Sequence, residues 1–180
     1  IGSDIEDISG STGFGDTLTG SAGANELFGY GGNDLLSGAA GNDVLRGGDG
    51  DDRVEGGDGA DNLYGDAGAD VVNGGNGDDN LWADAGADRL GGGAGIDRVI
   101  YDGDVGVIVT IGGVGHGGDA EGDVIGADIE DVQASGAGGN TVTGSAAAND
   151  IDGGQGNDHL SGGAGDDELW GAGGDDILNG

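Results

Sequence analysis

Aliphatic residues recur at every ninth position along most of this chain, in a background of glycine and acidic residues. From Gly20 a nine-residue segment repeats nine times, and its eighth residue is always Leu or Val. These residues are Leu27, Leu36, Leu45, Val54, Leu63, Val72, Leu81, Leu90 and Val99. The fourth residue of each segment is glycine, and the sixth is aspartate in every segment except the first, which has Asn25. So regular a period predicts a stack of short identical units.

A second array with the same spacing starts at Gly144, and its eighth residues are Ile151, Leu160, Leu169 and Leu178. Imperfect repeats precede the two arrays, at 11–19 and 135–143. Between the arrays the pattern changes, and a β-branched run at 105–111 predicts a strand. We therefore divide the chain into a lead-in at 1–19, a first array at 20–100, a strand-containing insert at 101–134 and a second array at 135–180.

A longer repeat is superimposed on the nonapeptides. The segment Asp4–Asp7 (Asp-Ile-Glu-Asp) recurs as Asp128–Asp131, at an offset of 124 residues, and 17–21 recurs as 141–145 at the same offset. We infer that the parent protein contains tandem copies of one module.

Each nonapeptide predicts one tight turn followed by one short strand. Glycines at the first, second and fourth positions allow positive φ and close approach of the backbone, so the first six residues form the turn. Residues seven to nine form a strand whose middle side chain points inward. Two nonapeptides make one coil, and strands of successive coils stack about 4.8 Å apart. The sequence therefore predicts an all-β protein, a parallel β-roll (β-solenoid).

The charge of the chain makes this stack unusual, because the coils would bring carboxylates close together. The chain has 36 acidic and 4 basic residues among 180, a formal charge of −32, and 50 glycines. This charge disfavours binding to nucleic acid or to an anionic membrane surface. No apolar run reaches the roughly 18 residues of a membrane-spanning helix. Cysteine is absent from the sequence, which excludes disulfides and thiolate metal sites. A cation is the natural partner of these carboxylates.

The sixth-position aspartates are the candidate metal ligands. Calcium takes six to eight oxygen ligands at about 2.3–2.6 Å from carboxylates and backbone carbonyls, which such a turn supplies. One edge of the roll would carry Asp43, Asp61, Asp79 and Asp97, with Asn25 at its end, and the other Asp34, Asp52, Asp70 and Asp88. The second array adds Asp158, Asp167 and Asp176. We expect multiple structural calcium ions, and folding coupled to their binding.

The consensus Gly-Gly-x-Gly-x-Asp-x-aliphatic-x resembles the repeats-in-toxin (RTX) family of secreted bacterial proteins. The segments 47–55 and 56–64 match it at every fixed position. The resemblance implies a parallel β-roll, export by type I secretion and folding on contact with extracellular calcium. The chain departs from the consensus where Asn25, Asn140 and Asn149 replace the sixth-position aspartate, so we expect weak or empty sites at the array starts.

Two other interpretations of the acidic residues compete with calcium binding. A solvated acidic linker needs no aliphatic residue at every ninth position, so the repeat disfavours it. A catalytic carboxylate pair is not needed to explain carboxylates that the repeat already explains, so we expect no enzyme. His116 and His159 share no spacing that indicates a site. The insert residues Asp102, Asp104, Asp119, Glu121 and Asp123 offer an additional ion site without a recognisable loop pattern.

The ninth position points outward and gives the roll two different faces. One face has Phe28, Arg46, Tyr64, Trp82 and Ile100, whereas the other has Ser37, Glu55, Asn73 and Gly91. Trp170 takes the ninth position in the second array. The aromatic side chains either cover one another as a ladder or form a surface for self-association or module packing.

Taken together, these patterns predict a structural calcium-binding module that acts outside the cell or at the bacterial surface. Tandem modules and a one-sided aromatic face favour a large adhesin, surface-layer or filament protein. The alternative is a non-catalytic C-terminal module for export and folding of a type I-secreted enzyme or toxin.

Overall fold

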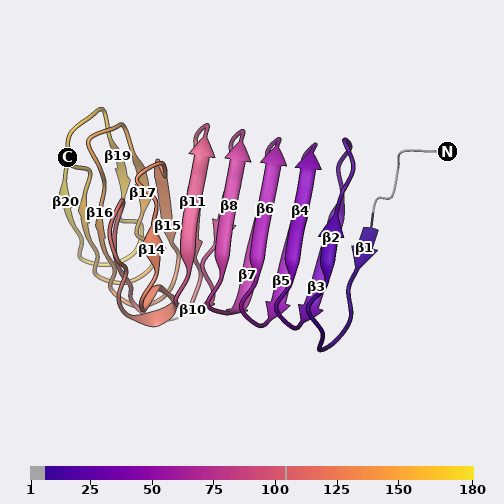
Figure 1. The fold of residues 1–180 in the computed structure, drawn as a ribbon. Helices are drawn as coiled ribbons and strands as arrows, with labels where there is room; N and C mark the ends of the chain where they lie inside the picture. Colours follow the sequence, from indigo (N-terminus) through magenta and orange to yellow (C-terminus); the bar gives the residue numbers. More distant parts are fainter. Residues whose placement is uncertain (1–6, 104) are drawn as a thin grey trace.

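Successive nonapeptides wind into a stack of coils in the computed structural model, which describes residues 7–103 and 105–180 (Figure 1). The strands of alternate repeats collect on opposite sides of the stack, and all the strand pairs within its sheets are parallel. The predicted all-β parallel β-roll is therefore confirmed.

One sheet, here called the long sheet, runs through the whole stack. Its order is β1 (Asp7–Ser9), β3 (Glu26–Gly31), β5 (Val44–Asp49), β7 (Asn62–Gly68), β9 (Asn80–Trp82), β12 (Arg98–Tyr101), β15 (Asp131–Ala134), β17 (Asp150–Asp152) and β19 (Glu168–Trp170). The short strand β10 (Ala85–Gly86) pairs with the end of β7.

Two shorter sheets form the opposite side. The front sheet contains β2 (Thr17–Thr19), β4 (Leu35–Ala40), β6 (Arg53–Asp58), β8 (Val71–Asn76), β11 (Arg89–Ala94) and β14 (Val124–Ile125). The C-terminal sheet contains β13 (Ile108–Thr110), β16 (Thr141–Thr143), β18 (His159–Ser161) and β20 (Ile177–Asn179). The predicted strand at 105–111 is thus present in its central part, as β13.

The core is a column of eighth-position side chains between the two sides. The register places Leu27 opposite Leu45 and Leu45 opposite Leu63, so identical positions stack from coil to coil. All nine eighth-position residues of the first array are at most 2% exposed. Burying these apolar side chains is energetically favourable, and because they occupy the same position in every repeat, they determine which face of each strand points inward.

The insert separates the two arrays in sequence but not in the stack. Strand β12 pairs directly with β15, so the long sheet passes from the first array to the second without a gap. On the other side, β14 stacks on β11, and β13 stacks on β16. Residues 114–116 lie between them, because Val114 bridges antiparallel to Val124 and His116 to Ile108. Between the two arrays, the side opposite the long sheet therefore contains three segments, namely β14, residues 114–116 and β13. The long sheet contains only β15 over the same part of the stack.

Helical structure plays no part in the stack. Among the described residues the one helix is the short 3-10 turn η1 (Gly118–Ala120), and none is long or apolar enough to cross a membrane. The first copy of the Asp-Ile-Glu-Asp segment lies outside the described residues except for Asp7, and so does Asp104 of the insert.

Candidate metal centre

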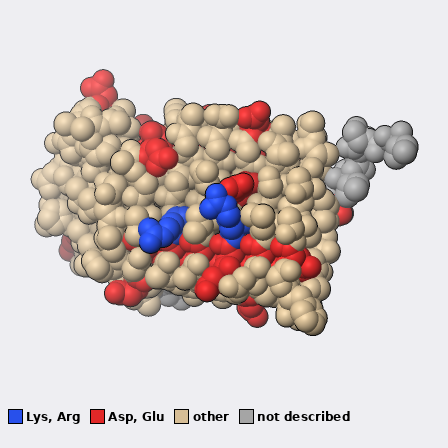
Figure 2. Space-filling view, in the orientation of Figure 1, with Lys and Arg blue, Asp and Glu red and all other residues tan. Residues whose placement is uncertain are grey.

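The turns of the roll form two edges, and each edge carries one row of sixth-position side chains. Edge 1 consists of the turns that lead into the long sheet, at 20–25, 38–43, 56–61, 74–79 and 92–97. Edge 2 consists of the turns that lead into the front sheet, at 11–16, 29–34, 47–52, 65–70 and 83–88. Edge 2 lies at the bottom of Figure 1, and Figure 2 shows acidic side chains gathered along the lower part of the front sheet.

The glycines shape the turns in two different ways. Gly48 and Gly50, at the second and fourth positions, have φ of 109° and 134°, a region that disfavours side chains. Gly56, at the first position, is needed for space instead, because a Cβ there would collide with Oδ2 of Asp61 and lie 2.5 Å from the carbonyl oxygen of Gly74. Seven of the nine first positions of the first array thus face a cradle of oxygen atoms from two successive coils.

One carboxylate oxygen of each sixth-position aspartate ties neighbouring turns together. The backbone N–H of Asp43 donates to Oδ1 of Asp61 at 2.8 Å, and that of Asp61 donates to Oδ1 of Asp79 at 2.9 Å. Edge 2 repeats this contact, for example from the N–H of Asp52 to Oδ1 of Asp70 at 2.8 Å. These bonds fix the second oxygen, Oδ2, in the cradle.

The second carboxylate oxygen is buried and lacks a hydrogen-bond partner at eight sixth positions. These are Asp34, Asp43, Asp52, Asp61, Asp70, Asp79, Asp97 and Asp158. Leaving a buried polar atom unpaired costs about 1–3 kcal/mol, and more when it is charged, so the row requires a partner that accepts oxygen ligands. A hard cation such as calcium meets that requirement, because the cradle supplies carboxylate and carbonyl oxygens only.

The carboxylates are paired between turns, not clustered. Across residues 7–103 and 105–180, no group of three or more His, Cys, Asp or Glu side chains is placed to hold a metal ion. In most cradles of the first array a main-chain carbonyl adds an oxygen, such as that of Gly74 beside Asp61.

Burial also perturbs the protonation of the ladder. Desolvation raises the pKa of Asp52 and Asp61 to about 6, and that of Asp70 and Asp79 to about 7, despite the backbone N–H that each accepts. Carboxylates of neighbouring turns, such as Asp43 beside Asp61, raise the pKa further. In the absence of a cation, Asp70 and Asp79 therefore retain protons near neutral pH in the folded ladder.

A family comparison agrees with this geometry. The model of the RTX calcium-binding nonapeptide repeat matches residues 10–45, 37–72, 46–81, 64–99, 134–160 and 152–180, which is well over half of the chain. The chain belongs to the RTX calcium-binding repeat family. RTX repeats bind Ca²⁺ at multiple sites, so the chain is a calcium-binding structural module. No curated protein matches the sequence.

The predicted calcium ligands differ in how deeply they are buried. The predicted aspartates of the first array and Asp158 are at most 3% exposed, whereas Asp167 and Asp176, near the last coils, are half-buried. The substituted positions Asn25, Asn140 and Asn149 are buried in the same rows. Asn149, for example, donates its backbone N–H to Oδ1 of Asp167 at 3.0 Å.

Three further carboxylates occupy ladder positions, although they were not among the predicted ligands. Asp16 starts edge 2, since its N–H donates to Oδ1 of Asp34 at 2.7 Å. Asp123 accepts the N–H of Asp88 at 2.9 Å, and Glu130 accepts that of Asp97 at 3.0 Å. The signal that would have found the latter two is an aliphatic residue two positions later, as in the nonapeptides, at Ile125 and Val132.

The acidic residues of the insert make different contacts, although Asp119 lies near both Asp84 and Asp123. Asp102 and Asp119 lie near Asp84, whose carboxyl pKa burial raises to about 6, with a further rise from these neighbours. Glu121 accepts the N–H of Gly117 at 2.9 Å, and Asp123 lies in the edge 2 row. The described acids of the insert are therefore not gathered in one site. Both histidines are exposed.

The raised pKa values predict that acid stabilises the metal-free roll. Folded Asp70 and Asp79 have a pKa of about 7, above the value of 3.8 expected in an unfolded chain, so the folded state binds more protons. Its stability is then highest near the unfolded pKa and falls as the pH rises towards about 7. Chelator-treated protein should show more β signal in circular dichroism at about pH 5 than at about pH 8.

The same comparison at high salt is the control, because salt screens the general repulsion between exposed charges but acts less on buried carboxylates. An equal β signal at both pH values would contradict the prediction.

The cradle predicts opposite outcomes for two glycine substitutions. Gly56→Ala places a methyl group against Asp61 Oδ2, so it should remove about one calcium ion per chain, counted by equilibrium dialysis. Gly91→Ala is the matched control, because its nearest atom would lie 3.7 Å away, an ordinary contact. Equal calcium binding by the two variants would show that the cradle holds no ion.

Proposed function

We propose that this chain is a structural, non-catalytic module of a secreted or surface bacterial protein, which folds and stiffens on extracellular calcium. The observation that carries the proposal is the row of buried Oδ2 atoms without hydrogen-bond partners. RTX repeats are typical of secreted bacterial proteins, which supports an extracellular location at the bacterial surface.

Coupling between calcium and folding follows from the electrostatics of the ladder. Without cations, the carboxylates of successive turns repel one another in a partly desolvated site, as the raised pKa of Asp79 indicates. Because the cradle needs two adjacent coils, it forms only when the chain winds, so the binding free energy is also folding free energy. Extracellular calcium-binding modules commonly have dissociation constants of about 10⁻⁴–10⁻³ M.

We further propose the division into a lead-in at 1–19, arrays at 20–100 and 135–180, and an insert at 101–134, within a parent protein that repeats the module. The recurrence of Asp4–Asp7 as Asp128–Asp131 supports tandem copies. Such a parent fits an adhesin, surface-layer or filament protein, in which stiffness along the chain is the useful property.

The test is a circular dichroism titration of chelator-treated protein with calcium and, separately, with magnesium. We expect a cooperative change from coil to β signal with calcium but not with magnesium at equal concentration, since magnesium demands a tighter octahedral site and gives up water reluctantly. A chelated protein that already has full β signal, unchanged by calcium, would reject the proposal.

The outward aromatic side chains of the long sheet support a second, separate proposal: this face packs on another copy of the module. Tyr64 and Trp82 stack with ring centroids 4.2 Å apart, and the Arg46 guanidinium lies 3.6 Å from the Tyr64 centroid. Phe28, Arg46, Tyr64 and Trp82 are half-buried, but Ile100, which the sequence placed on the same outward face, is only 8% exposed, so the candidate surface ends at Trp82. Trp170, which is 57% exposed, lies farther along the same sheet, beyond Gln133 and Asp152.

The double variant Tyr64→Ser, Trp82→Ser should lower the mass measured by light scattering in calcium, because it removes the flat aromatic surface. The matched control is Glu55→Ser, Asn73→Ser on the front sheet, which should leave the mass unchanged. Unchanged assembly in the aromatic variant would reject self-association through this face.

A further inference from the structure

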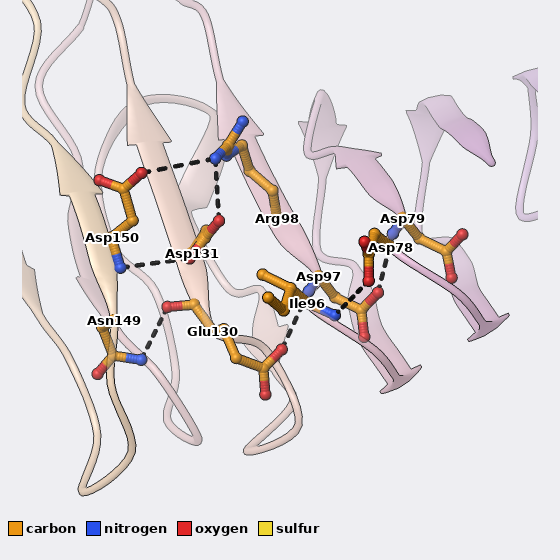
Figure 3. A network of polar contacts seen from close by, with 9 residues as sticks. All are labelled: Asp78, Asp79, Ile96, Asp97, Arg98, Glu130, Asp131, Asn149 and Asp150. Atoms are coloured by element: carbon orange, nitrogen blue, oxygen red, sulfur yellow. Dashed lines mark hydrogen bonds and ion pairs between the residues drawn. The ribbon is translucent and has the colours of Figure 1, made fainter. Parts of the chain in front are cut away.

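At the junction between the first array and the insert, the last turn of edge 1 faces a segment that is not a nonapeptide (Figure 3). Within the array, contacts along the ladder join residues 18 positions apart, whereas here Asp97 contacts Glu130, 33 positions later. The segment 126–131 has one glycine and no Gly-Gly-x-Gly pattern, so nothing in the repeat assigns it a metal site.

The junction nevertheless reproduces the cradle of the array. Within the array, a Cβ on Gly74 would meet Oδ2 of Asp79 and, at 2.5 Å, the carbonyl oxygen of Gly92. At the junction, a Cβ on Gly92 would meet Oδ2 of Asp97 and, at 2.6 Å, the carbonyl oxygen of Asp128. The carbonyl of Asp128 thus takes the place of the first-position glycine of the missing turn.

Glu130 takes the place of the missing sixth-position aspartate. Its Oε2 accepts the N–H of Asp97 at 3.0 Å, as Oδ1 of Asp97 accepts the N–H of Asp79 at 2.9 Å. The segment 126–131 follows a different path from a nonapeptide turn, and the longer side chain of glutamate still reaches the N–H of Asp97.

Oδ2 of Asp97 lacks a compensating partner, although Oδ1 accepts the N–H of Asp79. Asp97 is 0% exposed and its Oδ2 has no hydrogen-bond partner. The nearby basic side chain is committed elsewhere, because Arg98 pairs with Asp131 at 2.9 Å and Asp150 at 3.7 Å (Figure 3). A buried carboxylate oxygen without a partner points to a cation at this place.

On edge 2, the corresponding position between the first array and the insert has no open oxygen cradle. Asp123 accepts the N–H of Asp88 on Oδ1, but its Oδ2 accepts the hydroxyl of Tyr101 at 3.2 Å. In addition, the turn at 83–88 begins with the buried Ala83, whose Cβ stands where the other turns have glycine. The Tyr101 hydroxyl satisfies Asp123 Oδ2 and the Ala83 methyl group fills the space that a glycine leaves open, so the two edges differ at the junction.

We propose that Asp97, the carbonyl of Asp128 and Glu130 form a further calcium site, which carries the edge 1 ladder from the first array into the insert. The proposal rests on the proposed function of the array cradles and extends it to residues outside the repeat. The site ties the first array to the coil that begins the second copy of the Asp-Ile-Glu-Asp sequence.

The test counts calcium ions bound per folded chain by native mass spectrometry. Glu130→Gln keeps an oxygen that accepts the Asp97 N–H but removes the charge, so it should bind about one ion fewer than the unmodified chain. Glu55→Gln makes the same change at an exposed ion pair with Arg53 on the front sheet and should bind the full number.

An unchanged ion count and titration midpoint for Glu130→Gln would overturn the proposal. If that variant does not fold, crystals of the unmodified chain grown in calcium decide the question by anomalous diffraction. Peaks along the array turns but none beside Asp97 Oδ2 and the Asp128 carbonyl would also overturn it. A chain that binds no calcium at all would instead reject the proposed function.

Discussion

The structure depends on one electrostatic constraint, which is that buried carboxylate oxygens are stacked in two rows without partners from the protein. One oxygen of each aspartate accepts a backbone N–H from the preceding coil, and this bond holds the other oxygen in the cradle. The first-position glycines keep that space open, and the second- and fourth-position glycines bend the chain around it. The composition of the chain, rich in glycine and aspartate, follows from the construction of these cradles.

The hydrophobic core is too narrow to replace this electrostatic contribution. Each nonapeptide contributes one fully inward aliphatic side chain, while its glycines lose more backbone entropy on folding than other residues. Small domains with limited cores commonly depend on metal ions or disulfides, and this sequence has no cysteine. The core therefore selects the register, and in the proposed function calcium coordination contributes the stability that the core lacks.

Much of the fold was predictable from the sequence because position within the nonapeptide determines environment. The period placed Leu27 and Leu45 on the same inward column and the aspartates in the turns, as the register shows. The insert was less predictable, because Asp123 contacts Asp88, and Glu130 contacts Asp97, without the 18-residue spacing of the repeats. The pairing of strands in three dimensions brings them together. Glutamate at a position otherwise held by aspartate, and a tyrosine hydroxyl in the place of a ligand, also have no counterpart in the repeat.

The unequal growth of the two sides at the insert has a mechanical consequence. Three strand segments on one side face a single added strand on the other, so the insert acts as a wedge in the stack. Because strands lie about 4.8 Å apart, two extra strand segments on one side are expected to turn the stacking axis. In a polymer of such modules, a turn at every wedge would produce a superhelical fibre that extends like a spring under tension.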